Sequence, residues 1–402
     1  MSRLNGDSEI IVKAIRKFES TYGSSEHISV MAAPASLILL GDHTHYNEGI
    51  LLSAAVNRVW VIALKKRKDR TVNFASAQSD KFLSASFGTL EQIDCSEFNL
   101  LRRLTTLLYD LNYIKLGFDC VVSSNAPDCL GLGSFAGMQV AFLNNIKKVF
   151  ALNVDDSSLI DLIKKNEYPI LGKISNQAHH YTAAEAKEAK VYNFDLRTKL
   201  SQHISFFDKP LNIIICDTEE WLVSPQERCN ERVEECEIGV KGLRLYIWGI
   251  KNLRDVELDF LLRHIHMLPK RIFNRVLYNV NERKRAESAV KFVRKGMLED
   301  FGVLITESHW GLSKDYEISC ENSDFIVEEA VKLPGVVGSK MISCSPIKSV
   351  FNIVEENFTE NFINEIGSIY QGRYKSQLKF HILKITRGVK KVFSKEMAYL
   401  SN

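Results

Sequence analysis

An apolar run that stops abruptly at a group of polar side chains restricts how this chain can fold. Residues 32–53 read AAPASLILLGDHTHYNEGILLS. The run at residues 37–40 predicts a buried strand, and Gly41 permits a tight turn directly after it. Asp42, His43 and His45 follow at once, so several polar groups meet at one strand end, where ligand sites are common. A plain polar turn between two strands is the alternative interpretation.

Composition places the chain among ordinary globular proteins. Its 402 residues, 45% hydrophobic and 25% charged, are enough for two domains with buried cores. A net charge of +3 gives no argument for nucleic acid or an anionic membrane as partner. No window approaches the roughly 18 apolar residues of a membrane span, and the N-terminus lacks a signal-peptide pattern. The eight cysteines are scattered without a zinc-type cluster, which predicts a cytoplasmic protein without a metal site.

Helical and strand patterns are mixed along the whole chain. Helices are predicted at residues 7–23, 100–113, 156–166, 227–245, 258–268, 272–297, 298–309 and 324–332. Strands are predicted at residues 28–33, 36–40, 50–56, 59–66, 72–77, 117–124, 192–196, 211–218, 336–343, 349–354 and 378–385. The polar segment 172–190 is expected at the surface. A composition shift near residues 200–210 predicts two domains, residues 1–205 and 206–402.

A loop with several glycines precedes another long predicted helix. Residues 125–137 read NAPDCLGLGSFAG. Backbone N–H groups of such a loop, at the N-terminus of a helix, can hold an anion. Gly131, Gly133 and Ser134 are therefore candidates for binding a phosphate group. A helix-entry loop without a ligand is the other interpretation.

Several motifs, in order along the chain, resemble those of galactokinases, which belong to the GHMP superfamily of small-molecule kinases. The galactokinase motif P-G-R-V-N-L-I-G-E-H-T-D-Y-N-D-G aligns without gaps with PASLILLGDHTHYNEG. The motif P-x-G-G-G-L-S-S-S-A-A aligns with PDCLGLGSFAG in the same way. The run FGVLITESHWGLSKDYEISC closely follows a third galactokinase segment, and GSKMISCSPIKS lies where galactokinases have G-A-R-M-T-G-G-G-F-G-G-C.

The resemblance implies a two-lobed α+β fold of the GHMP-kinase type. The N-terminal lobe would hold a mixed sheet with helices, and the C-terminal lobe an antiparallel sheet covered by helices. ATP with Mg²⁺ and a sugar would lie in the cleft between the lobes. The reaction would transfer the γ-phosphoryl group to the 1-hydroxyl of galactose, which requires a cation near the phosphoryl group and a base near the hydroxyl.

The chain departs from galactokinases at both catalytic positions. Ser36 replaces the motif's arginine, and a hydroxyl cannot supply the cationic fork of a guanidinium. Asn176 replaces the catalytic aspartate of G-I-M-D-Q, and a register slip of one would place Ser175 there instead. An amide can hydrogen-bond a sugar but cannot act as a base. These changes predict a catalytically impaired protein.

The phosphate-binding motifs have changed as well. Cys129 and Leu130 stand at glycine positions, and Gly133 and Phe135 replace two of three serines, leaving Ser134 as a possible Mg²⁺ contact. In the third motif, non-glycine residues occupy the glycine positions, and a proline replaces the phenylalanine: Ser343, Cys344, Ser345, Pro346, Ile347 and Lys348. The resemblance therefore implies at most a weakened site for ATP and Mg²⁺.

The sugar-contact positions of the first motif are better preserved. His43, Thr44, Tyr46 and Asn47 match galactokinases, and Asp42 replaces a glutamate that is one methylene longer. His45 replaces an aspartate, which predicts a different pattern of recognised sugar hydroxyls. Cys229 stands at the position of a sugar-side tyrosine. Asp42, His43, His45 and Tyr46 are the predicted sugar-binding residues.

Three functional hypotheses follow. The first is a pseudokinase that binds a sugar or nucleotide and acts as a binding or regulatory module. The second is an active sugar 1-kinase in which Asp42, His179 or His180 is the base and Lys340 or Lys348 the cation. The third is a different enzyme whose metal ion would be bound by histidines, if these four converge: His43, His45, His179 and His180.

Overall fold

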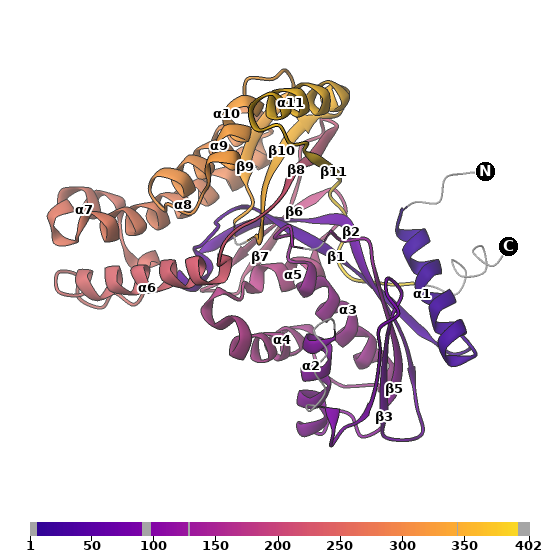
Figure 1. Ribbon diagram of the computed structural model, residues 1–402. Coiled ribbons are helices and arrows are strands. Elements are labelled where there is room, and N and C mark those ends of the chain that lie inside the picture. The colour runs from indigo at the N-terminus through magenta and orange to yellow at the C-terminus, as the bar shows by residue number, and fades with distance from the viewer. Residues whose placement is uncertain (1–5, 91–97, 128, 344, 393–402) are drawn as a thin grey trace.

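Two β-sheets, one in each lobe, organise the protein (Figure 1). The computed structural model describes residues 6–90, 98–127, 129–343 and 345–392. The first sheet has the order β12-β1-β2-β5-β3-β4, and β6 and β7 extend it from β2. The second sheet has the order β11-β8-β10-β9. The first is mixed, because β3 and β5 are parallel, and the second is antiparallel throughout. The predicted α+β fold class is confirmed.

The N-terminal lobe surrounds the first sheet. Its strands are β1 (Ser29–Leu40), β2 (Ile50–Lys66), β3 (Thr71–Ser76), β4 (Phe82–Ser86), β5 (Phe118–Ser124), β6 (Lys190–Asp195), β7 (Ser201–Ser205) and β12 (Lys390–Lys391). Its helices are α1 (Gly6–Tyr22), α2 (Asn99–Asp110), α3 (Ser134–Val149), α4 (Asp156–Leu171) and α5 (Gln177–Glu185). Apolar residues of β2, β3, β5, α2 and α3 form one core cluster, and α1 packs on the sheet with a second.

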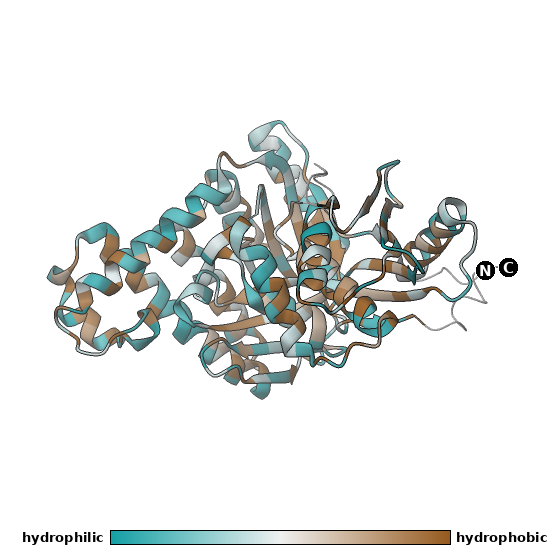
Figure 2. Cartoon of the chain, turned by 90° about the horizontal axis from the view of Figure 1, so that it is seen from below, coloured by the Kyte–Doolittle hydropathy of each residue, from teal (hydrophilic) through white to brown (hydrophobic). Residues whose placement is uncertain are grey.

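The C-terminal lobe places helices on the second sheet. Its strands are β8 (Leu211–Trp221), β9 (Val336–Met341), β10 (Ile347–Glu355) and β11 (Lys379–Leu383). Its helices are α6 (Pro225–Leu243), α7 (Leu258–Arg263), α8 (Lys270–Lys295), α9 (Leu298–Lys314), α10 (Glu321–Ala330) and α11 (Thr359–Tyr374). Hydrophobic residues of these elements turn inward, and Figure 2 shows hydrophilic residues prominent along the outlying helices.

The first two strands are longer than the sequence pattern predicts. The runs at residues 28–33 and 36–40 form one strand, β1, and the runs at 50–56 and 59–66 form β2. A proline lacks the N–H that a sheet needs, so Pro34 predicts an interruption. The pairing of β1 with β2 instead continues past Pro34, with a shift of register between Pro34 and Ala35.

The segment at residues 172–190 is the clearest error of the sequence-based prediction. It contains α5, which packs against α3 and β1 and whose residues are mostly buried. The polar groups of α5 are satisfied inside the protein, as when Ser53 and Thr182 share a hydrogen bond of 2.6 Å. Periodicity failed here because polar and apolar side chains are buried together on this short helix, so apolar residues alone do not mark its buried face. Helix α11 and the short strands β4, β7 and β12 were not predicted.

The chain passes from the first sheet to the second between Ser205 and Leu211, and β12 returns to the first sheet near the end of the described chain. The predicted domain boundary at residues 205 and 206 stays a prediction. No helix in the described ranges has the length and apolar character needed to cross a membrane.

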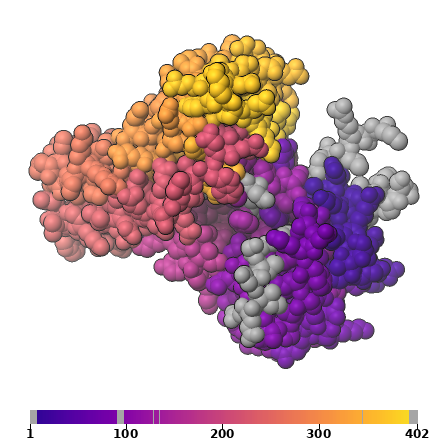
Figure 3. Space-filling view, in the orientation of Figure 1, coloured from indigo at the N-terminus to yellow at the C-terminus, as the bar shows by residue number. Residues whose placement is uncertain are grey.

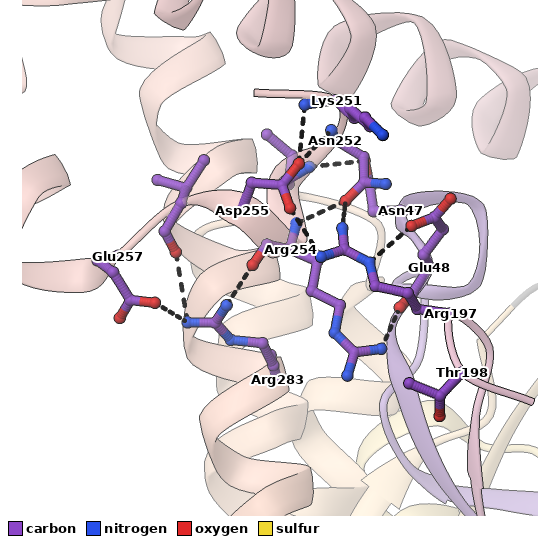
Figure 4. Close-up of polar contacts among 12 residues, drawn as sticks. Asn47, Glu48, Arg197, Thr198, Lys251, Asn252, Arg254, Asp255, Glu257 and Arg283 are labelled. Carbon is purple, nitrogen blue, oxygen red and sulfur yellow. Dashed lines mark hydrogen bonds and ion pairs between the residues drawn. The ribbon is translucent and has the colours of Figure 1, made fainter. Parts of the chain in front are cut away.

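Charged side chains tie the two lobes together beside the first motif (Figure 4). Arg254, on the short helix η4 (Leu253–Asp255) of the C-terminal lobe, binds both carboxylate oxygens of Asp195 on β6. Arg197 binds Glu48 at 2.8 Å and Asp255 at 2.7 Å. These pairs fix the loop after residue 47 against the C-terminal lobe.

A buried ion cluster supports α6 and α8. Glu235 accepts hydrogen bonds from Arg232 at 2.7 Å and from Arg275 at 2.8 Å, and the Arg275 side chain is fully buried. Arg232 also donates to the backbone oxygen of Tyr316, so the cluster holds the aromatic residues behind the first motif. A buried charge that loses its partner destabilises a protein strongly.

We therefore expect Glu235→Ala to lower the free energy of unfolding by about 3–5 kcal/mol, because Arg232 and Arg275 would lose their shared carboxylate. Glu234→Ala is the matched control, since Glu234 is the exposed neighbour on the same helix, and we expect a change within about 0.5 kcal/mol. Urea unfolding of both variants measures the difference. Equal stabilities would contradict a structural role for this cluster.

Candidate functional site

A cavity of about 360 Å³ lies between the lobes. Its wall comes from the turn after β1, the loop before α3, the α4–α5 connection, the start of α6 and the end of β9. Figure 3 shows the surface hollowed where the magenta part of the chain meets the salmon part. The volume is near the lower end of the ~300–1,000 Å³ range of small-molecule sites. A ligand the size of a monosaccharide fits such a cavity.

The turn after β1 carries Asp42 into the cavity wall. Gly41 has φ +94°, and a side chain on it would collide with the backbone oxygen of Ile50, so the turn needs glycine. The Asp42 carboxylate pairs with the ammonium of Lys340 on β9 and accepts a hydrogen bond of 2.7 Å from Ser343. Lys340 is fully buried. Both oxygens of Asp42 are thus engaged by the C-terminal lobe.

A second buried carboxylate, Glu282 on α8, completes this ion cluster. Its oxygens accept hydrogen bonds from the Gly41 amide at 2.8 Å and from Arg285 at 2.8 Å. Lys340 lies 3.9 Å away. Glu282 was not predicted from the sequence, because it is one of many charged residues in a long helix. Lys340 is the only charged residue in the predicted strand at residues 336–343. A single lysine in such a strand could have indicated a buried carboxylate as its partner.

Two histidines of the first motif line the cavity, while Tyr46 lies behind them. Nδ1 of His43 is 3.0 Å from the Tyr46 hydroxyl, which also hydrogen-bonds Tyr316. His45 Nε2 is 3.2 Å from the carbonyl oxygen of Ile174, so Nε2 carries the proton and donates. Tyr46 is therefore placed as a support for His43, and its role as a sugar contact stays a prediction.

Burial makes these rings poor bases. Burial, with the nearby cations Arg232 and Lys340, lowers the pKa of His43 to about 3. Burial and the neighbouring His43 and His179 rings lower the pKa of His45 to about 3. Burial and His180 lower the pKa of His179 to about 4. All three rings are neutral at pH 7 and supply hydrogen bonds rather than charge.

Ser36, at the arginine position of the motif, is fully buried and contacts His179. Its hydroxyl is 2.8 Å from Nδ1 of His179, and its N–H donates to the carbonyl oxygen of Leu132. The His179 ring packs so closely on Gly133 that a side chain there would overlap it. Ser36 and His179 thus fill the space beside the glycine loop with neutral groups.

Asn176, at the aspartate position, lines the cavity and caps α5. Its side-chain oxygen accepts a hydrogen bond of 3.0 Å from the Ala178 amide. This is a capping role that an asparagine performs well. The amide leaves no ionisable group at this position.

A buried carboxylate, Glu167 on α4, lies on the same side of the cavity and was not predicted. It accepts hydrogen bonds from Gln139 at 2.6 Å and Ser175 at 2.5 Å, and lies 3.0 Å from Nε2 of His180. Burial alone would raise the pKa of Glu167, but His180 and these two donors together lower it to about 2. Glu167 is the only acid in the run NEYPILGKISNQ, and no pattern in that run marks it as buried.

The loop before α3 is packed against the end of β9 and the following turn. The carbonyl oxygen of Cys129 accepts hydrogen bonds from the Ser345 hydroxyl at 2.8 Å and from the Ile347 amide at 3.3 Å. A side chain on Gly131 would meet Ile342 and Ser345. Phe135 is about half exposed at the start of α3, near Trp60. The predicted phosphate residue Ser134 begins α3, and the predicted Gly131 and Gly133 line the cavity.

No lysine or arginine is among the described residues that line the cavity. Lys348, a candidate cation, instead binds Glu220 at 2.8 Å and Asn322 at 3.3 Å. Lys340, the other candidate, is held by Asp42 behind the cavity surface. Within the described ranges, no group of three or more His, Cys, Asp or Glu side chains is arranged to hold a metal ion. The four-histidine hypothesis therefore gains no support.

Comparison with known proteins places these features in context. Residues 16–66 match the galactokinase galactose-binding signature. A galactokinase of Roseiflexus sp. is 26% identical over 376 residues, covering 94% of this chain and 96% of that protein. A galactokinase of Fusobacterium nucleatum is 27% identical over 391 residues, covering 94% and 98%.

Solved structures agree on the fold. The Lactococcus lactis galactokinase complexed with galactose superposes with a TM-score of 0.89 at 22% identity, covering 95% of this chain and all of that one. A mevalonate kinase superposes with a TM-score of 0.63 at 18% identity, covering 89% and 99%. The two-lobed architecture predicted from the motifs is therefore confirmed.

Because these histidines are buried, we expect the free energy of unfolding to decrease in mild acid. Their pKa values in the folded protein lie below the 6.5 of an exposed histidine, so the unfolded chain binds protons first as the pH falls. The stability that they contribute is complete above pH 6.5 and is lost as the pH falls toward 4. We expect the free energy of unfolding to decrease over this range, by up to about 1.4 kcal/mol per pH unit for each histidine.

Urea unfolding between pH 7 and 4.5 measures this slope. His43→Gln should flatten it, because one buried titrating ring is removed. His27→Asn is the control, since His27 is exposed and its left-handed backbone, φ 63°, suits asparagine. Equal slopes for wild type and His43→Gln would contradict the buried, neutral state of His43.

Proposed function

Since this chain belongs to the galactokinase family of the GHMP kinase superfamily, we propose that it binds a sugar in the cavity between its lobes without phosphorylating it. The observation that carries the proposal is the absence of lysine and arginine among the described residues of the cavity wall. Transfer of a phosphoryl group develops negative charge, which needs a fixed cation nearby. The protein would thus act as a sugar-binding or regulatory module.

The two altered catalytic positions support this proposal. Ser36 is buried and hydrogen-bonded to His179, and Asn176 is engaged in capping α5. Neither can remove a proton from a sugar hydroxyl. Loss of a catalytic base commonly costs roughly 10²–10⁴ in rate, and loss of a charged partner adds to that cost.

The residues present are a poor fit for ATP and Mg²⁺. In the family these would be held by the loop before α3 and the loop after β9. Here Ser345 and Ile347 bind the carbonyl oxygen of Cys129, so the two loops contact each other directly. Side chains at Ile342 and Ser345 also press on Gly131, where a phosphate group would need free backbone N–H groups. We propose that triphosphate binding is weak or lost.

The sugar half of the site supports retained binding. The galactose-binding signature spans the first motif, and the related Lactococcus lactis protein was solved with galactose. Asp42, His43 and His45 line the cavity here. We propose galactose or a closely related sugar as the ligand.

The alternative is an active sugar 1-kinase. It needs other groups to act as the base and as the cation that Asn176 and Ser36 cannot supply. Asp42 is engaged by Lys340 and Ser343, and the pKa of His179 near 4 makes it a weak base. Lys348 would have to leave Glu220. This alternative requires a rearrangement on ligand binding, and a direct assay distinguishes it from the proposed function.

We expect isothermal titration calorimetry to detect galactose binding and not Mg²⁺–ATP binding at millimolar concentration. Galactose should also raise the melting temperature, because a ligand of the folded state stabilises it by mass action. A coupled assay should detect no galactose-dependent formation of ADP. Galactose-dependent ADP formation would instead support the active kinase.

Gln226→Trp provides the control for the site. Gln226 is exposed on α6 and lines the cavity, so a bulky indole should obstruct it without disturbing the core. We expect this variant to melt at the wild-type temperature and to lose galactose binding. Any ADP formation that survives in this variant would arise from a contaminating enzyme and not from this site.

A further inference from the structure

Two histidine nitrogens in the cavity wall have no partner within the protein. Nδ1 of His45 and Nδ1 of His180 are buried, and neither has a hydrogen bond to any described residue. Both rings line the cavity. A buried polar atom without a partner is costly, and native proteins rarely keep one without a ligand or water. Each nitrogen is therefore a candidate contact for whatever fills the cavity.

The surroundings of His180 determine which of its nitrogens has no partner. Its side chain is 2% exposed, and Nε2 lies 3.0 Å from Glu167. Glu167 also accepts from Gln139 and Ser175, and its low pKa keeps it an anion that accepts the Nε2 proton. The ring is thus held by a carboxylate at Nε2 and has no hydrogen-bond partner at Nδ1 among the described residues.

His45 is oriented in the same way. Its Nε2–H donates to the carbonyl oxygen of Ile174, and its low pKa keeps the ring neutral. Nδ1 of His45 is therefore a bare acceptor. A hydroxyl group can donate to this nitrogen, and it can form a hydrogen bond with Nδ1 of His180, which has no partner among the described residues. An anionic oxygen cannot donate to Nδ1 of His45, and no lysine or arginine among the described residues of the wall would compensate its charge.

From this geometry we propose that His45 and His180 select an uncharged, hydroxyl-rich ligand, each by one hydrogen bond at Nδ1, and that Glu167 positions His180. This role rests on the proposed sugar-binding function. It adds a ligand contact at His180 on α5, and it excludes charged ligands. Phosphorylated sugars would be rejected. The His180–Glu167 pair then serves to select the ligand and not only to stabilise the fold.

The test uses the full chain, D-galactose as probe and two kinds of substitution. Glutamine reaches the position of Nε2 and lacks a polar atom at Nδ1, whereas asparagine retains a polar atom near Nδ1. We expect His45→Gln and His180→Gln each to weaken galactose binding roughly tenfold in calorimetry. His180→Asn should retain binding within about threefold of wild type.

His203→Gln is the matched control, because His203 is a partly buried histidine outside the cavity that donates through Nε2 to Glu185. It should bind galactose like wild type. A series of deoxygalactoses on wild type and His180→Gln then identifies the hydroxyl involved. Loss of that hydroxyl should weaken binding about tenfold in wild type and not at all in the variant. If a variant fails to fold, wild-type binding that no single deoxygenation weakens would still refute the histidine contacts.

The outcomes separate the two proposals. If wild type binds no sugar, the proposed function fails. If wild type binds galactose and both glutamine variants bind it equally well, the sugar site stands and the histidine contacts are refuted. Galactose 1-phosphate should bind at least tenfold more weakly than galactose, and equal or tighter binding would overturn selection for an uncharged ligand.

Discussion

The buried ammonium of Lys340 is the interaction on which the site depends. It lies beside Asp42 of the N-terminal lobe and 3.9 Å from Glu282 of the C-terminal lobe, and both carboxylates are buried. Removing these charges from water is costly unless each is paired and hydrogen-bonded. The Gly41 amide, bound to Glu282, extends the cluster into the turn that presents the first motif. The cluster thus sets both the orientation of the cavity wall and the contact between lobes.

The same cluster explains why Asp42 and Lys340 add no unpaired charge to the cavity. Asp42 and Lys340, which could have supplied a base and a cation, neutralise each other. Glu167 is engaged by three donors, and the histidines of the first motif are neutral because they are buried. The described cavity wall then offers hydrogen-bonding groups among apolar side chains, and its carboxylates Asp42 and Glu167 are already paired within the protein. Such a surface suits recognition of hydroxyl groups better than stabilisation of a charged transition state.

Contacts between the loop before α3 and the turn after β9 limit the shape of the cavity in the same region. Where galactokinases have glycines, Ser345 and Ile347 make direct hydrogen bonds to Cys129, and the cavity keeps a volume of about 360 Å³. Phe135 covers the start of α3 with an apolar ring. The charged pairs that join η4 to β6 and its following turn hold the lobes in this arrangement.

Hydrophobic periodicity and turn residues act locally, so the sequence pattern predicted most helices and strands and the turn at Gly41. The resemblance to galactokinase motifs implied the α+β class and pointed to Ser36, Asn176 and the glycine loop. The burial of α5, the pairing of Lys340 with Asp42 and the contact between Glu167 and His180 became visible only in the folded protein. These facts depend on contacts between residues far apart in the chain, with polar groups satisfying one another inside the protein. Periodicity reports burial only where the buried face is apolar, so it could not reveal them.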